Sequence, residues 1–389
     1  MTRLMAIRVL HVPGIAGGNA AELARAERAI GLDSWCVALD ANPMGYEVDE
    51  RHSPQKFGRL GFELMRWRLL WRAWRDYDVI HFNFGQTLMP AYLPSSGNSS
   101  GYPSWAQSLY RVYARAFEMR DLSFLKARGK SVFMTYQGDD ARQGDYCRDH
   151  FPITFAHRVE PSYYTAESDA AKRRRIDKVD CHADGIFALN PDLLHVLPQR
   201  ARFLPYANVD IHALIPVPRN SGAAPPVLVH APSHAALKGT DVVLRAIDAL
   251  RAEGLRFEFV LVQGKTRAEA LDIYRRADLC IDQLFAGWYG GLAVEMMALG
   301  IPVLSYLREQ DLVGLPPQMC ADLPVIRVEP QNLTQVLREW LAGPRDRLRD
   351  LGMRSRSFVE RWHDPLRVAG DLRYAYEEAL RWRALAGAG

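Results

Sequence analysis

The sequence predicts an α/β protein with two doubly wound parallel-sheet domains in tandem. Short apolar runs of strand length alternate with stretches of helical periodicity along most of the chain, which is typical of parallel sheets covered by helices on both faces. This alternation starts near residue 7 and starts again at residue 227, after a proline-rich stretch. The 389 residues of the chain are enough for two or three domains.

The first series of elements is assigned to residues 1–212. A strand is expected at residues 7–12, an apolar run that stops just before Gly14. The helix expected at residues 20–30 ends at Gly31, because glycine readily adopts the left-handed conformation that closes a helix. Further short apolar runs predict strands at residues 34–39, 78–82, 131–135 and 184–189.

Residues 213–226 are expected to form a linker, because proline, glycine and polar residues dominate there. The second series is assigned to residues 227–362. Residues 363–389 are expected to form an amphipathic helix that packs across both domains or caps the second. The elements expected in the second series are strands at 227–230, 257–262, 279–282 and 303–306, and helices at 240–252, 268–276 and from Gly290 onward.

Composition argues against several classes of protein. The net charge is only +4, which disfavours a dedicated nucleic-acid binder. The five cysteines are scattered without CxxC spacing, which disfavours a disulfide framework or a zinc site, and neither a metal nor another cofactor is expected. The sequence has no run that is apolar over the length of a membrane span and no signal-peptide pattern, so a cytoplasmic location is expected.

The most informative stretch begins at Gly290. Gly290 and Gly291 open a predicted helix, with Glu295 about one turn further on, and Gly300 closes it. Bare backbone N–H groups at a helix N-terminus can approach a phosphate closely, and the positive dipole end favours the anion. Glu295 could then accept hydrogen bonds from nearby hydroxyls, such as those of a ribose. The stretch favours a nucleotide-sugar site, and a structural helix with a tight start fits it as well.

A lysine stands directly before another predicted helix. Lys238 and Gly239 precede the helix expected at residues 240–252. The dipole makes this N-terminal position unfavourable for a cation unless an anion binds between the two. Lys238 is therefore a candidate phosphate ligand, and an ordinary surface lysine is the alternative.

Two loops of the first half follow predicted strands, at the edge where open α/β sheets bind ligands. One holds Gly17 and Gly18 without the spacing of the dinucleotide fingerprint, so a tight turn explains it as well as a ligand loop does. The other places two adjacent carboxylates, the second being Asp140, and Arg142 after the strand at 131–135. Its position favours a functional role over a solvated loop with a local ion pair.

Together these segments resemble glycosyltransferases of the GT-B fold, in the retaining group related to glycogen synthase and sucrose synthase (glycosyltransferase group 1, family-4-like). The resemblance covers nearly the whole chain and is most specific in its second half. The matching residues are Lys238-Gly239 for the donor-phosphate lysine; Gly290, Gly291 and Glu295 for the second half of a Glu-x7-Glu signature; Gly17-Gly18 for a glycine loop; Gly138 and Asp140 for a His-Gly-x-Asp loop; and Leu204-Pro205-Tyr206-Ala207-Asn208-Val209-Asp210 for a Pro-Asn-Gly-Val-Asp stretch.

The resemblance implies two Rossmann-like domains with a cleft between them and a C-terminal helix. It implies metal-independent transfer of a sugar, with retention, from a nucleotide-diphosphate sugar to a glycan, a lipid-linked glycan or a small molecule. The implied catalytic residues are Lys238, Glu295 and Asp140. The implied donor contacts are Gly17, Gly18, Ser233, His234, Lys238, Gly239, Gln263, Trp288, Tyr289, Gly290, Gly291 and Glu295, and the acceptor-side residues are Gln137, Gly138, Asp140 and Arg142.

Two departures concern groups that would touch the sugar. Gly287 stands where the signature has its first glutamate, so that contact is missing or comes from Trp288, Tyr289 or Asp282. Gln137 stands where a histidine is common, and an amide cannot act as an acid or base.

Two more departures concern the phosphates and the base. Ser233 replaces an arginine expected five residues before Lys238, with His234 as a candidate substitute. After Gln263 the chain runs directly into a helix, without the strand-and-loop segment that would touch the nucleotide base.

Two alternatives stay open. Sugar-nucleotide 2-epimerases that work without NAD share this architecture, but they need carboxylates and histidines around the sugar, which positions 137 and 287 do not supply. A catalytically silent scaffold that binds a partner would explain the missing glutamate.

Residues 59–75 predict a helix with two apolar faces flanked by arginines. A helix that covers a sheet needs only one such face. The second packs against another element, or it docks on an anionic membrane, which would suit a lipid-linked acceptor at the inner face. One face carries Leu60, Leu64, Trp67, Trp71 and Trp74, and the other Phe62, Met65, Leu69 and Ala73.

Overall fold

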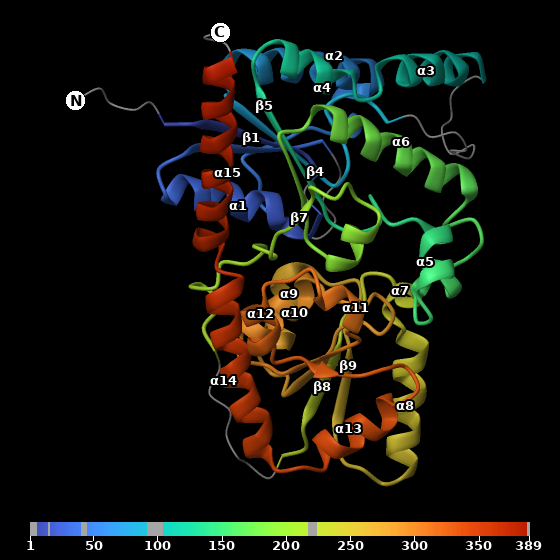
Figure 1. Ribbon diagram of the computed structural model, residues 1–389. Coiled ribbons are helices and arrows are strands. Elements are labelled where there is room, and N and C mark those ends of the chain that lie inside the picture. Colours follow the sequence, from blue (N-terminus) through green and yellow to red (C-terminus); the bar gives the residue numbers. More distant parts are fainter. Residues whose placement is uncertain (1–5, 15, 40–44, 92–103, 217–223, 387–389) are drawn as a thin grey trace.

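The computed structural model describes residues 6–14, 16–39, 45–91, 104–216 and 224–386. Within these ranges the chain forms a seven-stranded and a five-stranded sheet, one above the other in Figure 1. Every strand pair is parallel. The predicted α/β class with two doubly wound sheets is confirmed.

The first sheet has the strand order β3-β2-β1-β4-β5-β6-β7. The predicted strands of this half all form, within one or two residues of the expected ends. The two strands without a prediction, β3 and β7, are two residues long, too short to show a period. The bounds are β1 (Arg8–Pro13), β2 (Asp33–Ala38), β3 (Glu50–Arg51), β4 (Val79–Asn83), β5 (Ser131–Tyr136), β6 (Gly185–Ala188) and β7 (Arg202–Phe203).

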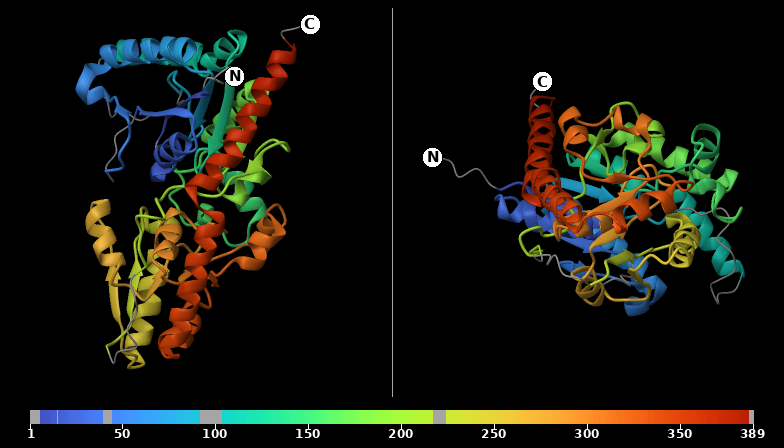
Figure 2. Two further views of the ribbon diagram at one scale, coloured as in Figure 1. Left: turned by 90° about the vertical axis from the view of Figure 1, so that its left-hand side faces the viewer. Right: turned by 90° about the horizontal axis from the view of Figure 1, so that it is seen from below.

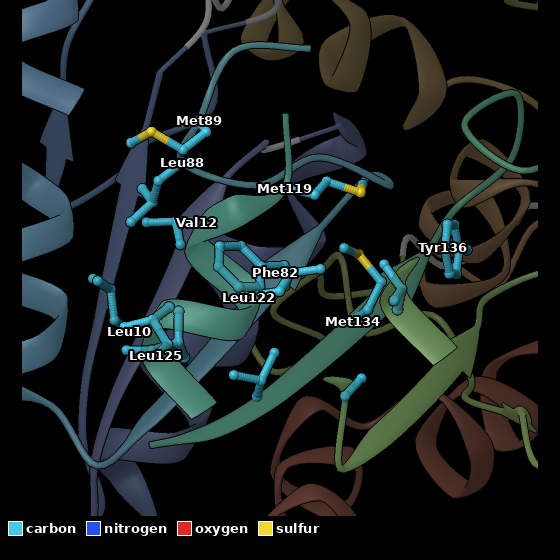
Figure 3. Close-up of a cluster of buried hydrophobic side chains, with 14 of the residues drawn as sticks. Leu10, Val12, Phe82, Leu88, Met89, Met119, Leu122, Leu125, Met134 and Tyr136 are labelled. Carbon is cyan, nitrogen blue, oxygen red and sulfur yellow. The ribbon is translucent and has the colours of Figure 1, made fainter. Parts of the chain in front are cut away.

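Helices cover both faces of this sheet because its strands are apolar on both faces. Leu10 faces a cluster that α2, α4 and α6 complete, shown in Figure 3, whereas Val9 beside it faces α1 and α15. The helices are α1 (Asn19–Ala29), α2 (Pro54–Asp76), α3 (Ser104–Phe117), α4 (Arg120–Ala127), α5 (Gly144–His150) and α6 (Ala166–His182), with short 3₁₀ helices η1 (Ala16–Gly18), η2 (Phe155–His157) and η3 (Pro191–His195).

The second sheet has the strand order β12-β11-β10-β8-β9. Its bounds are β8 (Val227–His230), β9 (Glu258–Leu261), β10 (Leu279–Ile281), β11 (Val303–Ser305) and β12 (Ile326–Arg327). The helices of this half are α7 (Ala235–Lys238), α8 (Thr240–Ala252), α9 (Arg267–Tyr274), α10 (Gly291–Ala298), α11 (Glu309–Leu312), α12 (Pro317–Asp322), α13 (Leu333–Leu341) and α14 (Arg345–Trp362).

The end of the chain returns to the first half. Helix α14 packs against α10 below, and α15 (Pro365–Ala386) packs against α1 above, as Figures 1 and 2 show. The expectation that this helix caps the second domain is therefore wrong. The apolar stripe of α15, with Leu372 and Tyr376, completes the core on one face of the first sheet.

Part of the predicted linker is also packed. Leu214 lies inside residues 213–226, yet its side chain is buried in the core of the second half together with Ile211. Residues 217–223 of this segment lie outside the described ranges. The predicted domain boundaries themselves stay a prediction.

Each sheet has a point where the strand order reverses, and the two points face the same space. In the first sheet the reversal lies between β1 and β4, and in the second between β8 and β10. Loops that leave the carboxyl ends of such strands diverge and leave a crevice. The sequence motifs at Gly17 and Lys238 follow β1 and β8, so the fold brings them to facing edges.

Candidate functional site

A cavity of about 260 Å³ lies between the carboxyl edges of the two sheets. Eight of the predicted site residues line it: Gly17, Gln137, Gly138, Arg142, Ser233, Lys238, Gly290 and Gly291. Among the other lining residues, the sequence pointed only to Asp139, as one of two adjacent carboxylates, and to Tyr206 and Asn208, as part of a matching stretch. The rest had no predicted role: Ala16, Asn19, Phe84, Phe155, Asn190, Leu237, Gln283 and Ala286.

Lys238 is held by a buried carboxylate. It ends the short helix α7, and its Nζ lies 3.2 Å from Asp282 Oδ1 and 2.5 Å from Gln283 Oε1. Asp282 follows β10 and is fully buried. This carboxylate stabilises the cation beside a helix N-terminus and leaves the ammonium at the cavity wall.

The N-terminus of α10 opens onto the same wall. The Gly290 N–H donates to Asp282 Oδ2 at 2.6 Å, so one carboxylate ties this backbone to Lys238. A Cβ at Gly290 would lie 3.2 Å from the Lys238 Nζ, and a Cβ at Gly291 would lie 2.9 Å from the Asn208 side chain. Both glycines are needed for close approach, and the first N–H groups of a helix have no intrahelical acceptor.

Three buried amide side chains at the cavity have atoms without a hydrogen-bond partner. These atoms are Asn19 Nδ2, Gln137 Nε2 and Asn208 Oδ1. Two of the amides are anchored by their other atom: Asn19 accepts from the Ala207 N–H at 2.7 Å, and Asn208 donates to the Gly291 carbonyl at 3.3 Å. Buried polar atoms are rarely unpaired in proteins, so these amides fit a polar ligand.

In the loop after β5, Asp139 lines the cavity in place of Asp140, for which the acceptor side was expected. Asp140 turns back to the chain and accepts the N–H groups of Gln137, at 3.1 Å, and Gly138, at 2.6 Å. Burial raises the pKa of Asp140 to about 6 against these hydrogen bonds. Asp139 lines the cavity instead. The expectation that Asp140 faces the acceptor is not supported, because its carboxylate closes the turn.

Asp139 is kept ionised by its surroundings. Tyr163 and Tyr164 each donate a hydroxyl to it at 2.6 Å. Burial acts to raise the pKa of Asp139, but the Arg142 charge and the two tyrosine hydroxyls outweigh it and lower the pKa below the usual value. Arg142 is itself fixed by a two-bond pair with Asp192, at 2.6 and 3.1 Å.

Glu295 lies beside the cavity rather than in its lining. Its Oε1 accepts from Arg267 Nε at 3.1 Å, and burial raises its pKa while the Arg267 charge opposes the rise. Gly18, one residue beyond the lining residue Gly17, packs so closely that a Cβ there would lie 2.5 Å from the Tyr46 ring.

Trp288 and Tyr289 are turned away from the cavity, which corrects the expectation that they contact the sugar. Both side chains are fully buried in the core of the second half, with their rings 4.3 Å apart. The Tyr289 hydroxyl meets His363 Nε2 at 2.8 Å. The apolar core takes these aromatic rings, so their side chains offer no contact there.

Three further predicted donor contacts lie outside the cavity lining. His234 is exposed with its ring 5.9 Å from that of Tyr163, so it does not take the place of the missing arginine in this arrangement. Gln263 is exposed beyond β9. Gly239 adopts a φ of 78° and joins α7 to α8, which is a structural role.

Metal binding and membrane crossing each need a recognisable arrangement of residues. Within the ranges given above, no group of three or more His, Cys, Asp or Glu side chains is arranged to hold a metal ion. In the same ranges, no helix combines the length and apolarity that crossing a membrane requires.

The arrangement matches solved structures of known fold. Sucrose-phosphate synthase from Thermosynechococcus elongatus aligns with a TM-score of 0.58 and 16% identity, over 96% of this chain and 98% of that chain. The catalytic domain of starch synthase IV from Arabidopsis thaliana, bound to ADP and acarbose, aligns with a TM-score of 0.60 and 11% identity, over 97% of this chain and 100% of that chain. HepE from Anabaena, in complex with UDP-glucose, aligns with a TM-score of 0.59 and 11% identity, over 96% of this chain and 100% of that chain.

The chain has the GT-B fold. No family model matches the sequence, and no curated protein matches it either. At these identities the neighbours establish the GT-B architecture and no more. The activity is argued from the residues of the cavity itself.

Proposed function

We propose that this GT-B protein transfers a sugar from a nucleotide-diphosphate sugar to an acceptor bound at the first half. The cavity between the two sheets carries the proposal, because Lys238, the start of α10 and unpaired amide atoms meet there. The cation and the helix end suit a diphosphate. The amides suit the hydroxyls of a sugar.

Leaving-group stabilisation supplies the main chemistry in this proposal. As the bond between sugar and phosphate breaks, the departing diphosphate gains negative charge. Lys238 and the first N–H groups of α10 are aimed at that charge, and Asp282 fixes both before a donor binds. Protein cations and dipoles would then do the work of a metal. Retention of configuration is proposed from the family resemblance.

The acceptor-side carboxylate is assigned to Asp139 instead of Asp140. Asp139 lines the cavity and is ionised, so it can accept a hydrogen bond from an acceptor hydroxyl. Gln137 and Asn190 lie on the same wall, and Asn190 Nδ2 holds the Gln137 carbonyl at 2.6 Å. A neutral amide at position 137 positions a hydroxyl and exchanges no proton with it.

Replacement of Lys238 tests the donor site. A panel of UDP-, GDP-, ADP- and dTDP-sugars is screened by thermal shift, since a ligand at a hundred times its Kd adds about 2.7 kcal/mol. Lys238→Ala is expected to abolish the shift and to lower kcat/KM about 100-fold or more, because the charge acts on the leaving group. Arg245→Ala, which removes an exposed cation on α8, is the control.

Turnover by Lys238→Ala within about threefold of the native rate would contradict the phosphate assignment. No shift of the native protein with any donor would favour a silent scaffold. An epimer formed from donor alone, seen by NMR, would favour a 2-epimerase.

We also propose that the outer face of α2 and α3 docks on an anionic membrane that carries the acceptor. The face is formed by Leu60, Leu64, Trp67 and Trp71 of α2 and by Leu109 and Val112 of α3, all exposed. The opposite side of α2, with Phe62, Leu69 and Ala73, is buried in the core. Helix α3 therefore packs beside α2 and leaves most of its second apolar face exposed. Trp74, which was expected on this face, is instead half-buried against the core.

Two contacts hold α3 in this position. Trp67 Nε1 donates to the Tyr113 hydroxyl at 3.0 Å, and the Tyr110 hydroxyl donates to Glu63 at 3.1 Å. Both helices lie at the end of the molecule away from the second sheet (Figure 1). A membrane on this face would leave the cavity between the sheets free to take a nucleotide sugar.

The exposed charged residues around this apolar face are basic, which favours an anionic partner. The two helices carry only two acidic residues, and each is paired: Glu63 with Arg66 at 3.4 Å and Asp76 with Arg75 at 2.7 Å. Their exposed basic residues are Lys56, Arg68, Arg75, Arg111 and Arg115. Tryptophan and arginine around an apolar stripe fit an interface of anionic lipid headgroups.

Vesicle co-sedimentation tests this surface. Leu64→Glu with Trp71→Glu is expected to lower binding to phosphatidylglycerol-containing vesicles at least about tenfold, because two charges enter the apolar stripe. Val313→Glu, on an apolar residue of the second half that is even more exposed, should leave binding unchanged. Equal binding by all three proteins, or equal binding to vesicles of phosphatidylcholine alone, would contradict the proposal.

A further inference from the structure

One contact between the two halves of the chain lies next to the cavity, beside Glu295. Arg267, the first residue of α9, pairs with Glu295 and is about one third exposed. Its guanidinium carbon lies 5.7 Å from the centre of the Tyr46 ring, which belongs to the first half. Tyr46 rests on Gly18 and on the alanines of α1. These three side chains, Tyr46, Arg267 and Glu295, form one cluster across the cleft.

The cluster continues the phosphate end of the cavity. Gly17 and Asn19 line the cavity, and Gly18 between them touches Tyr46. On the facing side, Gly291 lines the cavity, and Glu295 lies four residues further along α10, about 6 Å on the rise of a helix. A group attached to a diphosphate at the start of α10 can therefore reach this cluster.

The cluster has groups for both parts of a nucleoside. Glu295 is a buried carboxylate with a raised pKa, and a ribose diol can donate hydrogen bonds to it. Tyr46 offers an aromatic face, and bases stack on such faces and on guanidinium planes. Arg267 offers five N–H donors in a plane, which suits the edge of a base.

The path of the chain explains why an arginine lies here. Strand β9 ends at Leu261 and α9 begins at Arg267, with Thr266 as its N-cap and a side-chain bond to the Glu269 N–H. This short connection places the first residue of α9 directly at the carboxyl edge of the sheet.

We infer that Arg267 and Tyr46 form the nucleoside-recognition end of the donor site. This inference rests on the proposed function. When no nucleotide is bound, the Arg267 guanidinium offsets the negative charge of the buried Glu295 carboxylate. With a nucleotide bound, ribose hydroxyls share that carboxylate, while the guanidinium and the Tyr46 ring contact the base. Arg267 and Tyr46 therefore set affinity for the nucleoside and leave affinity for the phosphates unchanged.

Binding of UDP, GDP, ADP and dTDP, and of inorganic pyrophosphate, is measured by calorimetry. Arg267→Ala is expected to lower the affinity for the preferred nucleotide at least tenfold. Its affinity for pyrophosphate should fall less than twofold, because pyrophosphate lacks a nucleoside. Arg275→Ala, an exposed arginine at the C-terminus of α9 that pairs with Asp272, should match the native protein. Tyr46→Leu should lower the affinity for the nucleotide in the same way as Arg267→Ala.

Arg267→Lys guards against a folding defect, since it keeps a cation beside Glu295 and loses the planar guanidinium. It is expected to bind the preferred nucleotide at least threefold more weakly. Native affinity for all four nucleotides in Arg267→Ala, or an equal loss of nucleotide and pyrophosphate, would overturn the inference. If the native protein binds pyrophosphate but no nucleotide, the proposed function fails as well.

Discussion

At the scale of single residues, Gly287 stands where the Glu-x7-Glu signature would have its first glutamate. It adopts a φ of 83°, in the left-handed region. A Cβ built there would lie 2.5 Å from Arg308 Nη1 and 2.9 Å from Asp311 Oδ2. Arg308 is buried, pairs with Asp311 at 2.6 Å and lies over the Phe151 ring. The place of the missing glutamate is occupied by this pair.

Gly287→Ala is expected to lower the free energy of unfolding by about 2–4 kcal/mol, from left-handed strain of about 1 kcal/mol or more and from overpacking of about 1–3 kcal/mol. Gly254→Ala is the matched control, because Gly254 has a φ of 81° and nothing within 4 Å of its Cβ position. Urea denaturation measures both. An equal loss in the two variants would mean that the Arg308 contact is not a steric limit.

At the scale of elements, the loop after β5 is organised by one carboxylate. Asp140 holds the backbone of Gln137 and Gly138, and this places Asp139 at the cavity. The carboxyl has a raised pKa because burial disfavours its charged form. The loop that carries the proposed acceptor-side groups is therefore expected to be sensitive to pH through Asp140.

Asp140 gives stability a distinct pH dependence. Its pKa is about 6 in the folded chain against 3.8 for an ordinary aspartate, so the folded state binds its proton more tightly. The stabilisation is complete below about pH 4 and is lost as pH rises through 6. Relative to Asp140→Asn, the native protein should lose about 1–3 kcal/mol between these pH values in urea denaturation. A constant difference between the two proteins would contradict the raised pKa.

At the scale of the whole molecule, the end of the chain is tied to its beginning. The Tyr376 hydroxyl of α15 donates to Glu27 at 3.0 Å and meets His81 Nδ1 at 2.6 Å. His81 Nε2 lies 2.7 Å from Thr135 Oγ1, and Glu27 also meets His11 at 2.9 Å. Burial lowers the pKa of His81 well below its usual value, so His81 stays neutral in this network.

Tyr376→Phe is expected to destabilise the protein by about 1–3 kcal/mol, because it removes the hydroxyl that His81 Nδ1 and Glu27 Oε1 share and leaves these two buried atoms unpaired. Tyr374→Phe on the same helix should cost almost nothing, since Tyr374 is exposed. Thermal unfolding and proteolysis of α15 report the effect. Equal unfolding curves for the two variants would show that the network does not hold the helix.

Much of the fold is readable from the sequence because its signals are local. Apolar runs, Gly31 and Gly300 at helix ends, and the restart of the pattern at residue 227 predict two parallel sheets, and both are present. Eight predicted residues, among them Lys238 and Gly290, line the cavity, because loops after parallel strands meet at one edge.

The tertiary structure decided where individual side chains point. Trp288 and Tyr289 are adjacent to the glycine motif in sequence, yet packing takes them into the core. Asp139 and Asp140 are adjacent too, and only the turn geometry assigns one to the cavity and one to the backbone. Arg267 is a common surface residue type whose partner, Glu295, comes close only in the fold.

The sequence by itself determined the alternation of the main strands and helices, the sheet edge at which the cavity lies, and the cation and glycines found there, because each follows from local pattern. Only the tertiary structure decided that Asp282 holds Lys238, that Arg308 fills the place beside Gly287, and that α15 joins the first half. These choices depend on burial and on contacts between residues far apart in the chain, which no local pattern records.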